Sequence, residues 1–280
     1  MKKVIALTCL SVLPFSYAAA EGFQVNAQST KQAGMGHVGA ALKLGAESMH
    51  FNPAGLAFMD KTIDLSAGVS GVFAHAKYSN NSYYSAVNSN TAIASDYRAK
   101  TDNTPSTPLY LYAGFKIYDN LAAGISLNTP YGSGINWGND WAGAHLVQNI
   151  SLQAFNLQPT VAWKITDKLS IGAGLMVMFG NITLDRALIG PGAMTAVGQN
   201  MINSIPENMQ GLVKPMIDPI MNELSRYEET SAASVSLNGS SQTRFGFNVG
   251  AMYDINEKWT VGLSYRSKVT AKVKEGDISL

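Results

Sequence analysis

Apolar and polar side chains alternate along much of this chain with the period of two that is typical of half-buried β-strands. The clearest example runs from Arg244 to Ile255, where apolar residues occupy every second position and mostly polar or small residues lie between them. After a short turn at 256–258, the alternation resumes at Trp259 and continues to Val269. An apolar face backed by a polar one, with aromatic residues at strand ends, fits a barrel wall that has lipid outside and a polar lumen inside.

A hairpin motif with the spacing Ile-x-Asp/Glu-x-Leu/Trp-x-x-Gly occurs three times, starting at Ile117, Ile165 and Ile255. The connections between hairpins are much longer, and the longest covers 186–242. Short turns at one end of the strands and long loops at the other are typical of outer-membrane barrels, whose long loops face outward. We predict about seven strands, at 62–76, 108–118, 121–131, 152–165, 168–184, 243–255 and 258–273.

The odd number of strands has a structural consequence. An antiparallel barrel that closes between its first and last strands normally takes an even number. Seven strands leave two edges with unpaired backbone groups, which hydrocarbon does not tolerate. We therefore expect an all-β fold, a transmembrane antiparallel β-barrel that is incomplete in this sequence, with residues 62–280 forming its N-terminal part.

The first twenty residues have the pattern of a cleaved secretory signal peptide. Lys2 and Lys3 precede an apolar run at 4–15, and three alanines at 18–20 supply small residues for cleavage. The rest of the sequence holds no apolar run of about eighteen residues, which a spanning helix would need. We expect residues 1–20 to be removed and the remainder to act in the outer membrane.

Composition narrows the class of protein further. Charged residues make up 14% of the chain, against roughly 25% in soluble domains, which suits a wall that faces lipid. The net charge of +1 and the absence of a basic cluster argue against nucleic acid as a partner. The single cysteine, Cys9, lies in the signal peptide, so no disulfide is expected. A soluble β-sandwich stays open as an alternative.

Enzyme motifs and metal motifs give no support for catalysis. Residues 34–39 satisfy the dinucleotide spacing G-x-G-x-x-G, but no βαβ unit surrounds them. His37, His50, His75 and His145 lack the spacing of metal ligands. We expect no catalytic residue, no metal and no cofactor, and interpret the chain as something other than an enzyme.

The segment 21–61 differs from the strands because it is rich in small residues and lacks alternation. It closes with Asn52, Pro53 and Ala54, where Asn-Pro favours a turn and excludes helical geometry at the asparagine. A compact segment ahead of a barrel predicts a plug in the lumen. A disordered leader is the alternative reading.

Three short stretches carry a resemblance to a known family. They are Gly22-Phe23-Gln24 after the predicted cleavage site, Asn52-Pro53-Ala54, and Leu263-Ser264-Tyr265-Arg266-Ser267 after the third hairpin. In this order they resemble the FadL/TodX family of outer-membrane transporters for long-chain fatty acids and other hydrophobic compounds. The resemblance covers nearly the whole chain after the signal peptide. It implies a monomeric barrel of about fourteen strands whose lumen is closed by an N-terminal hatch, with Phe23, Asn52, Pro53 and Ala54 in that hatch.

The third predicted strand reaches a proline in the stretch Asn128, Thr129, Pro130, Tyr131 and Gly132. Proline has no N–H for the ladder, and glycine weakens the pairing further. Either the strand ends at Pro130, or it kinks there and opens the wall sideways. The resemblance favours the kink, because a kinked third strand forms a lateral exit in that family.

The long connection at 187–241 contains an apolar stripe at helical spacing. Pro215 and Pro219 should break it into short helices instead of one long helix. Its flexible apolar surface could bind ligand, or it could only pack the loop onto the barrel. The stripe residues that we expect to contact ligand are Met209, Leu212, Val213 and Met216.

Arg186 lies where the fifth predicted strand enters this connection. An arginine at a strand end is commonly a solvated charge. The resemblance instead matches it to a basic residue near a ligand pocket, and a guanidinium suits a carboxylate head group.

These features predict passive transport of hydrophobic molecules, foremost long-chain fatty acids. The expected steps are capture at the outward loops, rearrangement of the hatch and lateral exit into outer-membrane lipid. An adhesive or structural outer-membrane barrel is the main alternative, and a secreted hydrolase on a soluble β scaffold is a third.

Overall fold

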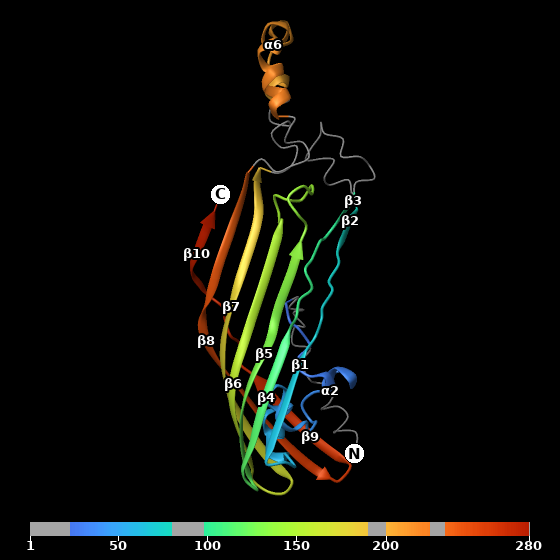
Figure 1. Cartoon of the computed structure of the whole chain (residues 1–280), viewed down its shortest axis with the longest axis vertical. Coiled ribbons are helices and arrows are strands. Elements are labelled where there is room, and N and C mark those ends of the chain that lie inside the picture. The colour runs from blue at the N-terminus through green and yellow to red at the C-terminus, as the bar shows by residue number, and fades with distance from the viewer. Residues whose placement is uncertain (1–22, 80–97, 190–199, 225–232, 280) are drawn as a thin grey trace, which may run out of the picture.

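The computed structural model of the chain describes residues 23–79, 98–189, 200–224 and 233–279. The predicted signal peptide at 1–20 lies outside these residues. One tall, curved antiparallel sheet forms most of the molecule, and a short hairpin of β2 (Lys77–Ser79) and β3 (Arg98–Lys100) lies near its upper end (Figure 1).

Sequential strands are neighbours throughout the large sheet, and the order is β1-β4-β5-β6-β7-β8, with β9 and β10 following one another along the free edge of β8. The strands are β1 (Ile63–Val69), β4 (Leu109–Tyr118), β5 (Leu121–Asn136), β6 (Asn149–Lys164), β7 (Leu169–Ile189), β8 (Ala233–Asn256), β9 (Trp259–Arg266) and β10 (Val273–Ser279). The all-β antiparallel fold class is confirmed. In the described part of the chain the sheet is not closed, because β1 pairs only with β4 and β9 only with β8.

The large sheet has eight strands instead of the seven predicted, because the strand predicted at 258–273 ends at Arg266 and is followed by β10. The strand predicted at 62–76 ends at Val69.

Three other strands extend well beyond their predicted ends. β5 continues to Asn136, β7 continues to Ile189, and β8 begins at Ala233. The connection predicted at 187–241 is therefore shorter than expected. The sequence pattern does not predict these extensions. Residues still alternate there, but the polar ones lie on the outer face, so the pattern differs from that of a lipid-facing strand.

The expectation of short helices in the long connection is wrong. α6 (Glu207–Leu224) is one continuous helix with Pro215 and Pro219 inside it. Each proline frees the carbonyl four residues earlier, which belongs to Gly211 and to Pro215 itself. Both of these residues are exposed, so water can satisfy the freed carbonyls. The helix projects beyond the upper ends of β7 and β8 (Figure 1).

Residues 23–61, called the N-terminal segment below, form short helical turns against one face of the sheet. They are α2 (Thr30–Gly34), η1 (Gly45–Glu47), α3 (Ser48–Phe51) and η2 (Pro53–Phe58). Ser29 caps α2 by accepting a bond from the Gln32 N–H, and Asn52 caps η2 by accepting one from the Ala54 N–H, each at 3.1 Å. We call the face that carries this segment the inner face.

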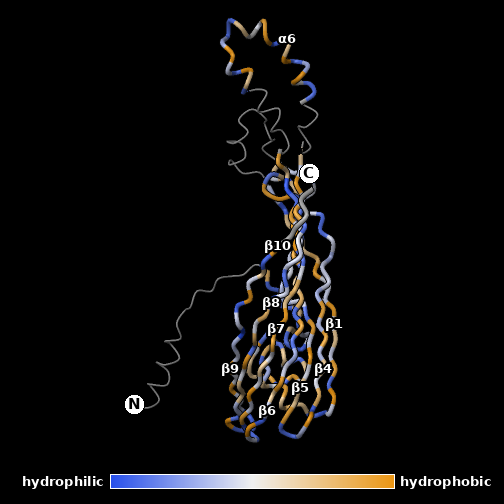
Figure 2. Tube along the Cα trace, turned by 90° about the vertical axis from the view of Figure 1, so that its left-hand side faces the viewer, coloured by the Kyte–Doolittle hydropathy of each residue, from blue (hydrophilic) through white to orange (hydrophobic). Residues whose placement is uncertain are grey.

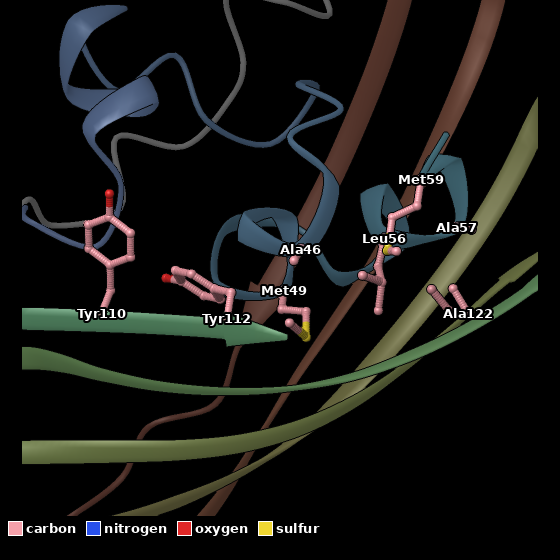
Figure 3. Close-up of a cluster of buried hydrophobic side chains, with 9 residues drawn as sticks. Ala46, Met49, Leu56, Ala57, Met59, Tyr110, Tyr112 and Ala122 are labelled. Atoms are coloured by element: carbon pink, nitrogen blue, oxygen red, sulfur yellow. The ribbon is translucent and has the colours of Figure 1, made fainter. Parts of the chain in front are cut away.

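Apolar side chains of the N-terminal segment pack against the inner face. Figure 3 shows Met49, which lies beside Tyr112, and Leu56, both pointing from the segment toward the strands. The other face of the lower sheet is exposed and apolar. Hydrophobic and hydrophilic residues alternate along its strands (Figure 2). The buried cluster comprises Ala46, Met49, Leu56, Ala57, Met59, Tyr110, Tyr112, Ala122 and Ala162.

A glycine makes the closest approach between strand and segment possible. A Cβ added at Gly172 of β7 would lie 2.4 Å from the Pro53 carbonyl carbon and 2.6 Å from the Ala54 nitrogen. Gly172→Ala should therefore weaken docking of the N-terminal segment by about 1–3 kcal/mol, the usual cost of overpacking. Limited proteolysis of residues 23–61 in the folded protein measures this effect. Ala173→Val, on the opposite face of the same strand, is the control, and equal protease sensitivity in both variants would contradict the packing described.

Candidate functional site

The wall of the sheet has a gap between β4 and the upper part of β5. β4 begins at Leu109, whereas β5 continues to Asn136 and so extends beyond its neighbour. The register of β5 against β6 shifts between Asn128 and Tyr131, around Pro130. The strand therefore bulges at the proline and continues, and the alternative that it ends there is wrong. A cavity of about 460 Å³ occupies the gap, and its lining includes Val25, Val72, Pro108, Thr129, Ile135 and Leu152.

The first described residues of the N-terminal segment pair with the bulge. Val25 N–H donates to the Pro130 carbonyl, and Gly132 N–H donates to the Phe23 carbonyl, both at 2.9 Å. Gln24 thereby forms an antiparallel bridge with Tyr131. A short piece of backbone thus satisfies the polar groups of β5 that β4 does not reach.

Side chains of three strands hold the middle of the N-terminal segment through its backbone carbonyls. Gln158 of β6 donates to the Met49 carbonyl at 2.7 Å. Asn248 of β8 donates to the Met49 and His50 carbonyls at 3.2 and 3.1 Å. Arg266 of β9 also donates to the His50 carbonyl, and its guanidinium lies 3.3 Å from His50 Nε2. Two adjacent carbonyls therefore tie the segment to strands that lie far apart in the sequence.

Asn52 joins the segment to β8 while it caps η2. Its side-chain amide donates to the Ala40 carbonyl at 2.6 Å and to the Ala251 carbonyl at 3.1 Å. Ser170 of β7 donates to the Ala54 carbonyl at 3.0 Å. The Asn52-Pro53-Ala54 stretch thus makes the kind of contact expected of a segment fixed to a wall, and its role as a hatch element stays a prediction.

Two ionisable groups are buried at this contact. Glu47 is 1% exposed and accepts hydrogen bonds from Ser29, Ser66 and Lys31. Burial would raise the pKa of Glu47, but these three donors outweigh it and lower the pKa below its ordinary value. Burial, reinforced by the nearby charge of Arg266, holds the pKa of His50 well below its ordinary value, so His50 is neutral.

Above the N-terminal segment the two faces of the sheet exchange their polarity. β6 pairs with β7 without a register shift, so alternate residues stay on one face along its whole length. Its outer face changes from Trp163, Val161, Leu157 and Phe155 to Gln153, Ser151 and Asn149. Its inner face changes from Gln158 and Asn156, beside the segment, to Ala154, Leu152 and Ile150.

The neighbouring strands repeat this exchange. The outer residues at the upper level are polar and bond across strands, as in Thr183 with Asn238 at 2.9 Å and Asn149 with Asp185 at 2.9 Å. The inner residues paired with Ile150 and Leu152 are apolar or glycine: Ile182, Leu184, Leu237 and Gly239. A lipid-facing band therefore ends near Phe155, and an apolar inner wall begins above the N-terminal segment.

A second cavity lies between this apolar wall and the N-terminal segment. Its volume is about 970 Å³, near the upper end of the ~300–1,000 Å³ range of small-molecule sites. Its lining includes Phe23, Tyr131, Leu152, Met176, Met178 and Arg266. Phe23 and Tyr131 place this cavity directly beside the wall gap.

The structure separates the predicted ligand residues from one another. Arg186 lies on the same inner face as Leu184, opposite Val235, near the top of β7. Met209, Leu212, Val213 and Met216 lie on α6, beyond the sheet. Leu212 and Met216 are 77% and 74% exposed, so this stripe does not pack the helix onto the barrel. The kink residues and Phe23 come together at the wall gap.

Sequence reasoning missed the residues that hold the N-terminal segment on the sheet: Gln158, Asn248 and Arg266 on the strands, and Glu47 and His50 within the segment itself. The available signal was the polar character of inner-face positions in otherwise apolar strands. The partners could not be inferred, because backbone carbonyls of an irregular segment leave no mark in the sequence.

Within the described ranges, no cluster of three or more histidine, cysteine, aspartate or glutamate residues could hold a metal ion. Among the described helices, none combines the length and the apolar character that a membrane-spanning helix requires.

Comparison with known proteins gives consistent similarities. Residues 11–279 match the family described as "Outer membrane protein transport protein (OMPP1/FadL/TodX)". Outer membrane protein P1 of Haemophilus influenzae is 28% identical over 264 residues, which are 90% of this chain and 54% of that protein. The long-chain fatty acid transport protein of Escherichia coli K12 is 24% identical over 270 residues, 96% of this chain and 56% of that protein. The chain thus spans about half the length of these curated relatives.

Two solved structures share the fold. A Pseudomonas aeruginosa FadL homologue superposes with a TM-score of 0.55 and 18% identity, covering 88% of this chain and 53% of the other. The toluene transporter TodX of P. putida gives a TM-score of 0.55 and 15% identity, covering 89% of this chain and 60% of the other.

The buried neutral histidine predicts acid sensitivity of the docked segment. The folded pKa of His50 lies below its ordinary value of 6.5, so the released segment binds a proton more readily than the docked one. The contribution of neutral His50 to docking of the segment is therefore complete above pH 6.5 and declines as the pH falls below it. Glu47 adds a further loss of docking stability below its ordinary pKa of 4.5. Protease sensitivity of residues 23–61 should rise between pH 7 and pH 5.

His50→Gln provides the comparison, because glutamine keeps polar atoms but does not titrate in this range. The rise between pH 7 and pH 5 should be smaller in this variant. His75→Gln, at an exposed position, should behave as the unmodified protein does. An unchanged pH profile in His50→Gln would show that the sensitivity originates elsewhere.

Proposed function

The chain belongs to the outer membrane protein transport family (OMPP1/FadL/TodX), and from this premise we propose that the whole protein carries hydrophobic molecules into the outer membrane by lateral exit. The family and its relatives are outer-membrane proteins, so the predicted localisation is confirmed. The route and the substrate are proposals, argued below from the geometry of the described residues.

The main support for this proposal is the exchange of polarity between the two faces of the sheet. A wall that is polar outside and apolar inside, above a lipid-facing band, suits an apolar solute on its lumenal side. Below that level, the inner face is polar and holds the N-terminal segment. A hydrophobic molecule therefore has apolar contacts down to the segment, and the path turns toward the gap beside Pro130.

Residues 23–61 act as a hatch in this proposal. Donors from β6, β7, β8 and β9 bind the hatch carbonyls, and apolar side chains fill the space between the hatch and β4. A long-chain solute would have to break several of these bonds to pass straight through. Exit through the gap requires only that residues 23–25 leave Pro130 and Gly132.

Lateral exit is also favoured by the free energy of transfer. Each methylene that moves from water to hydrocarbon contributes ~0.8 kcal/mol. The solute keeps this contribution if it leaves the apolar lumen at the lower rim of the gap. There Pro130 lies level with Phe155, at the upper edge of the lipid-facing band beside β4 and β5. A solute that followed an aqueous path below the hatch would lose this favourable free energy of transfer.

The exposed stripe of α6 supports capture at the outward end. Met209, Leu212 and Met216 present flexible apolar surface that adapts to chains of different shape. Arg186, lower down on the inner face, can bind a carboxylate head group after capture. One curated relative is named for transport of long-chain fatty acids, and we propose this class as the substrate.

The two free sheet edges require partners in the membrane. β1 and β9 each leave one row of backbone groups unpaired in the described residues, and hydrocarbon cannot satisfy them. We propose that the whole protein supplies further strands that pair with both edges and close the barrel as a monomer.

An adhesive or structural role is the alternative. It would use the outward loops alone and needs neither an apolar inner wall nor a gap beside a proline bulge. Transport accounts for the outward loops, the apolar inner wall and the gap beside Pro130, so we prefer it.

A disulfide across the Gln24–Tyr131 bridge tests lateral exit. Their side chains lie directly opposite, close enough for a disulfide. The double variant Gln24→Cys/Tyr131→Cys should lose most of its fatty-acid uptake when oxidised and regain it on reduction. Ser151→Cys/Thr183→Cys joins two strands that are already paired and should transport normally in both states. Normal uptake by the oxidised Gln24–Tyr131 pair would exclude this exit.

Arg186→Ala tests the carboxylate contact. Loss of a charge-assisted bond of about 1.5–3 kcal/mol weakens binding by roughly ten- to a hundred-fold. A fatty alcohol of equal length should lose little, because it carries no charge. Titration of both ligands against the whole protein gives the comparison. Equal losses of affinity for acid and alcohol would show that Arg186 is a solvated charge and does not contact the carboxylate.

A further inference from the structure

The outer face of the upper sheet carries a regular array of polar side chains. β6, β7 and β8 each contribute three outer residues to it, and the residues of one strand lie directly opposite those of the next. We call these nine residues the polar grid, and none of them is apolar, so hydrocarbon does not suit this surface. Its three rows are Gln153, Asn181 and Ser240; Ser151, Thr183 and Asn238; and Asn149, Asp185 and Ser236.

The polar grid begins directly above the lipid-facing band. Phe155 and Phe179 are opposite one another at the top of that band, and their rings stack with centroids 5.7 Å apart. From Phe179 to Asp185 the strand extends roughly 20 Å at ~3.3 Å per residue. Head groups add only about 5–8 Å to each side of the hydrocarbon core of a bilayer. The grid therefore reaches past the head groups, to the level of the sugars that cover the outer leaflet of an outer membrane.

The polar grid is almost uncharged. Asp185 is its one charged residue, and the Asp185 carboxylate accepts hydrogen bonds from Asn149 and Ser236. Surfaces that face only water carry roughly 25–35% charged residues, and surfaces that bind lipid phosphates carry lysine or arginine. The grid contains neither of these basic residues, so it suits a partner that is polar and neutral.

Hydrogen bonds within the polar grid hold its side chains in place. Thr183 donates to the Asn238 side chain at 2.9 Å, and Ser240 donates to the Asn181 side chain at 3.2 Å. Asn238 also donates to the Ser236 hydroxyl at 3.2 Å. Hydroxyl and amide groups keep further donor and acceptor capacity after one such bond. Sugar hydroxyls also donate and accept, and side chains that are already ordered lose little entropy when they bind them.

The polar grid is open on the side of β5. Gly132 and Gly134 lie opposite Gln153 and Ser151 there, and neither glycine places a side chain beside the grid. The cavity in the wall gap reaches this side, because its lining includes Asn149, Ser151 and Gln153. A sugar ring can therefore lie flat against β6 without meeting a side chain from β5.

We propose that the polar grid binds the neutral core sugars of the glycolipid in the outer leaflet, through hydroxyl and amide hydrogen bonds. The lipid-facing band supports this choice of partner, because a glycolipid whose acyl chains lie against the band places its sugars beside the grid. The surface lies on the outside of the wall, so the proposal does not depend on transport through the lumen.

Lipopolysaccharide that carries its core oligosaccharide is the first probe. Lipid A, which has the same acyl chains and phosphates but no core, is the second, and each is titrated against the whole protein in a neutral detergent. The lipid with the core should bind about ten-fold more tightly than lipid A. This preference should persist in high salt, because the grid offers no cation to the phosphates. Equal affinities, or a preference that disappears in high salt, would overturn the proposal.

Two pairs of substitutions locate the sugar contact. Thr183→Val/Asn238→Leu removes the bonded pair in the middle row and nearly keeps the shape of both side chains, so the preference for the lipid with the core should be lost. Asn181→Leu/Ser240→Ala removes the bonded pair in the next row and should have the same effect. This second variant gives an independent test if the first one folds poorly.

Thr62→Val/Asn208→Leu is the matched control. It makes the same two exchanges at exposed positions outside the polar grid, just before β1 and on α6. This variant should keep the full preference for the lipid with the core. A preference that survives in both grid variants, or one that the control variant also loses, would show that the grid is not the sugar contact.

Discussion

Every backbone polar group of an irregular segment that is buried against a sheet must find a hydrogen-bond partner. Residues 23–61 cannot meet this requirement within their own short helical turns, so side chains of the sheet meet it for them. Gln158, Asn248 and Arg266 donate to two adjacent carbonyls, and Ser170 donates to the Ala54 carbonyl. These donors occupy the inner face of strands whose outer face is apolar. The polar inner face and the path of the N-terminal segment both follow from that requirement.

The same constraint explains why the N-terminal segment lies against the wall gap. Pro130 has no N–H, and the bulge around it leaves backbone groups of β5 beyond the reach of β4. Phe23 and Val25 supply the missing partners from the beginning of the N-terminal segment. A wall closed by three residues of a separate segment can open without any strand of the sheet moving. Above this level the inner face needs no donors, and it changes to Leu152, Ile182 and Leu184.

The strands of the lower sheet were predictable from the sequence, because lipid demands an apolar residue at every outer position. Arg244–Ile255 and its continuation from Trp259 show this pattern directly. The upper ends of β5, β7 and β8 were not recognised, since polar outer residues such as Asn181 and Asn238 imitate a loop. The two prolines predict a broken helix at the position of α6, because the sequence does not show that the helix is exposed. Water satisfies the carbonyls that Pro215 and Pro219 free. The hatch contacts depend on which carbonyl meets which strand, and the sequence contains no pattern for that.

Photo-crosslinking with a fatty acid that carries a diazirine on its tail tests the route most directly. In the whole protein, adducts should fall on the apolar inner wall, at Leu152, Ile182 and Leu184, and on the wall gap, at Val72 and Pro108. Positions below the hatch on the same inner face, such as Lys116 and Thr260, should remain unlabelled. Labelling concentrated at those lower positions, with the gap unlabelled, would show that the solute passes through the hatch and would contradict lateral exit.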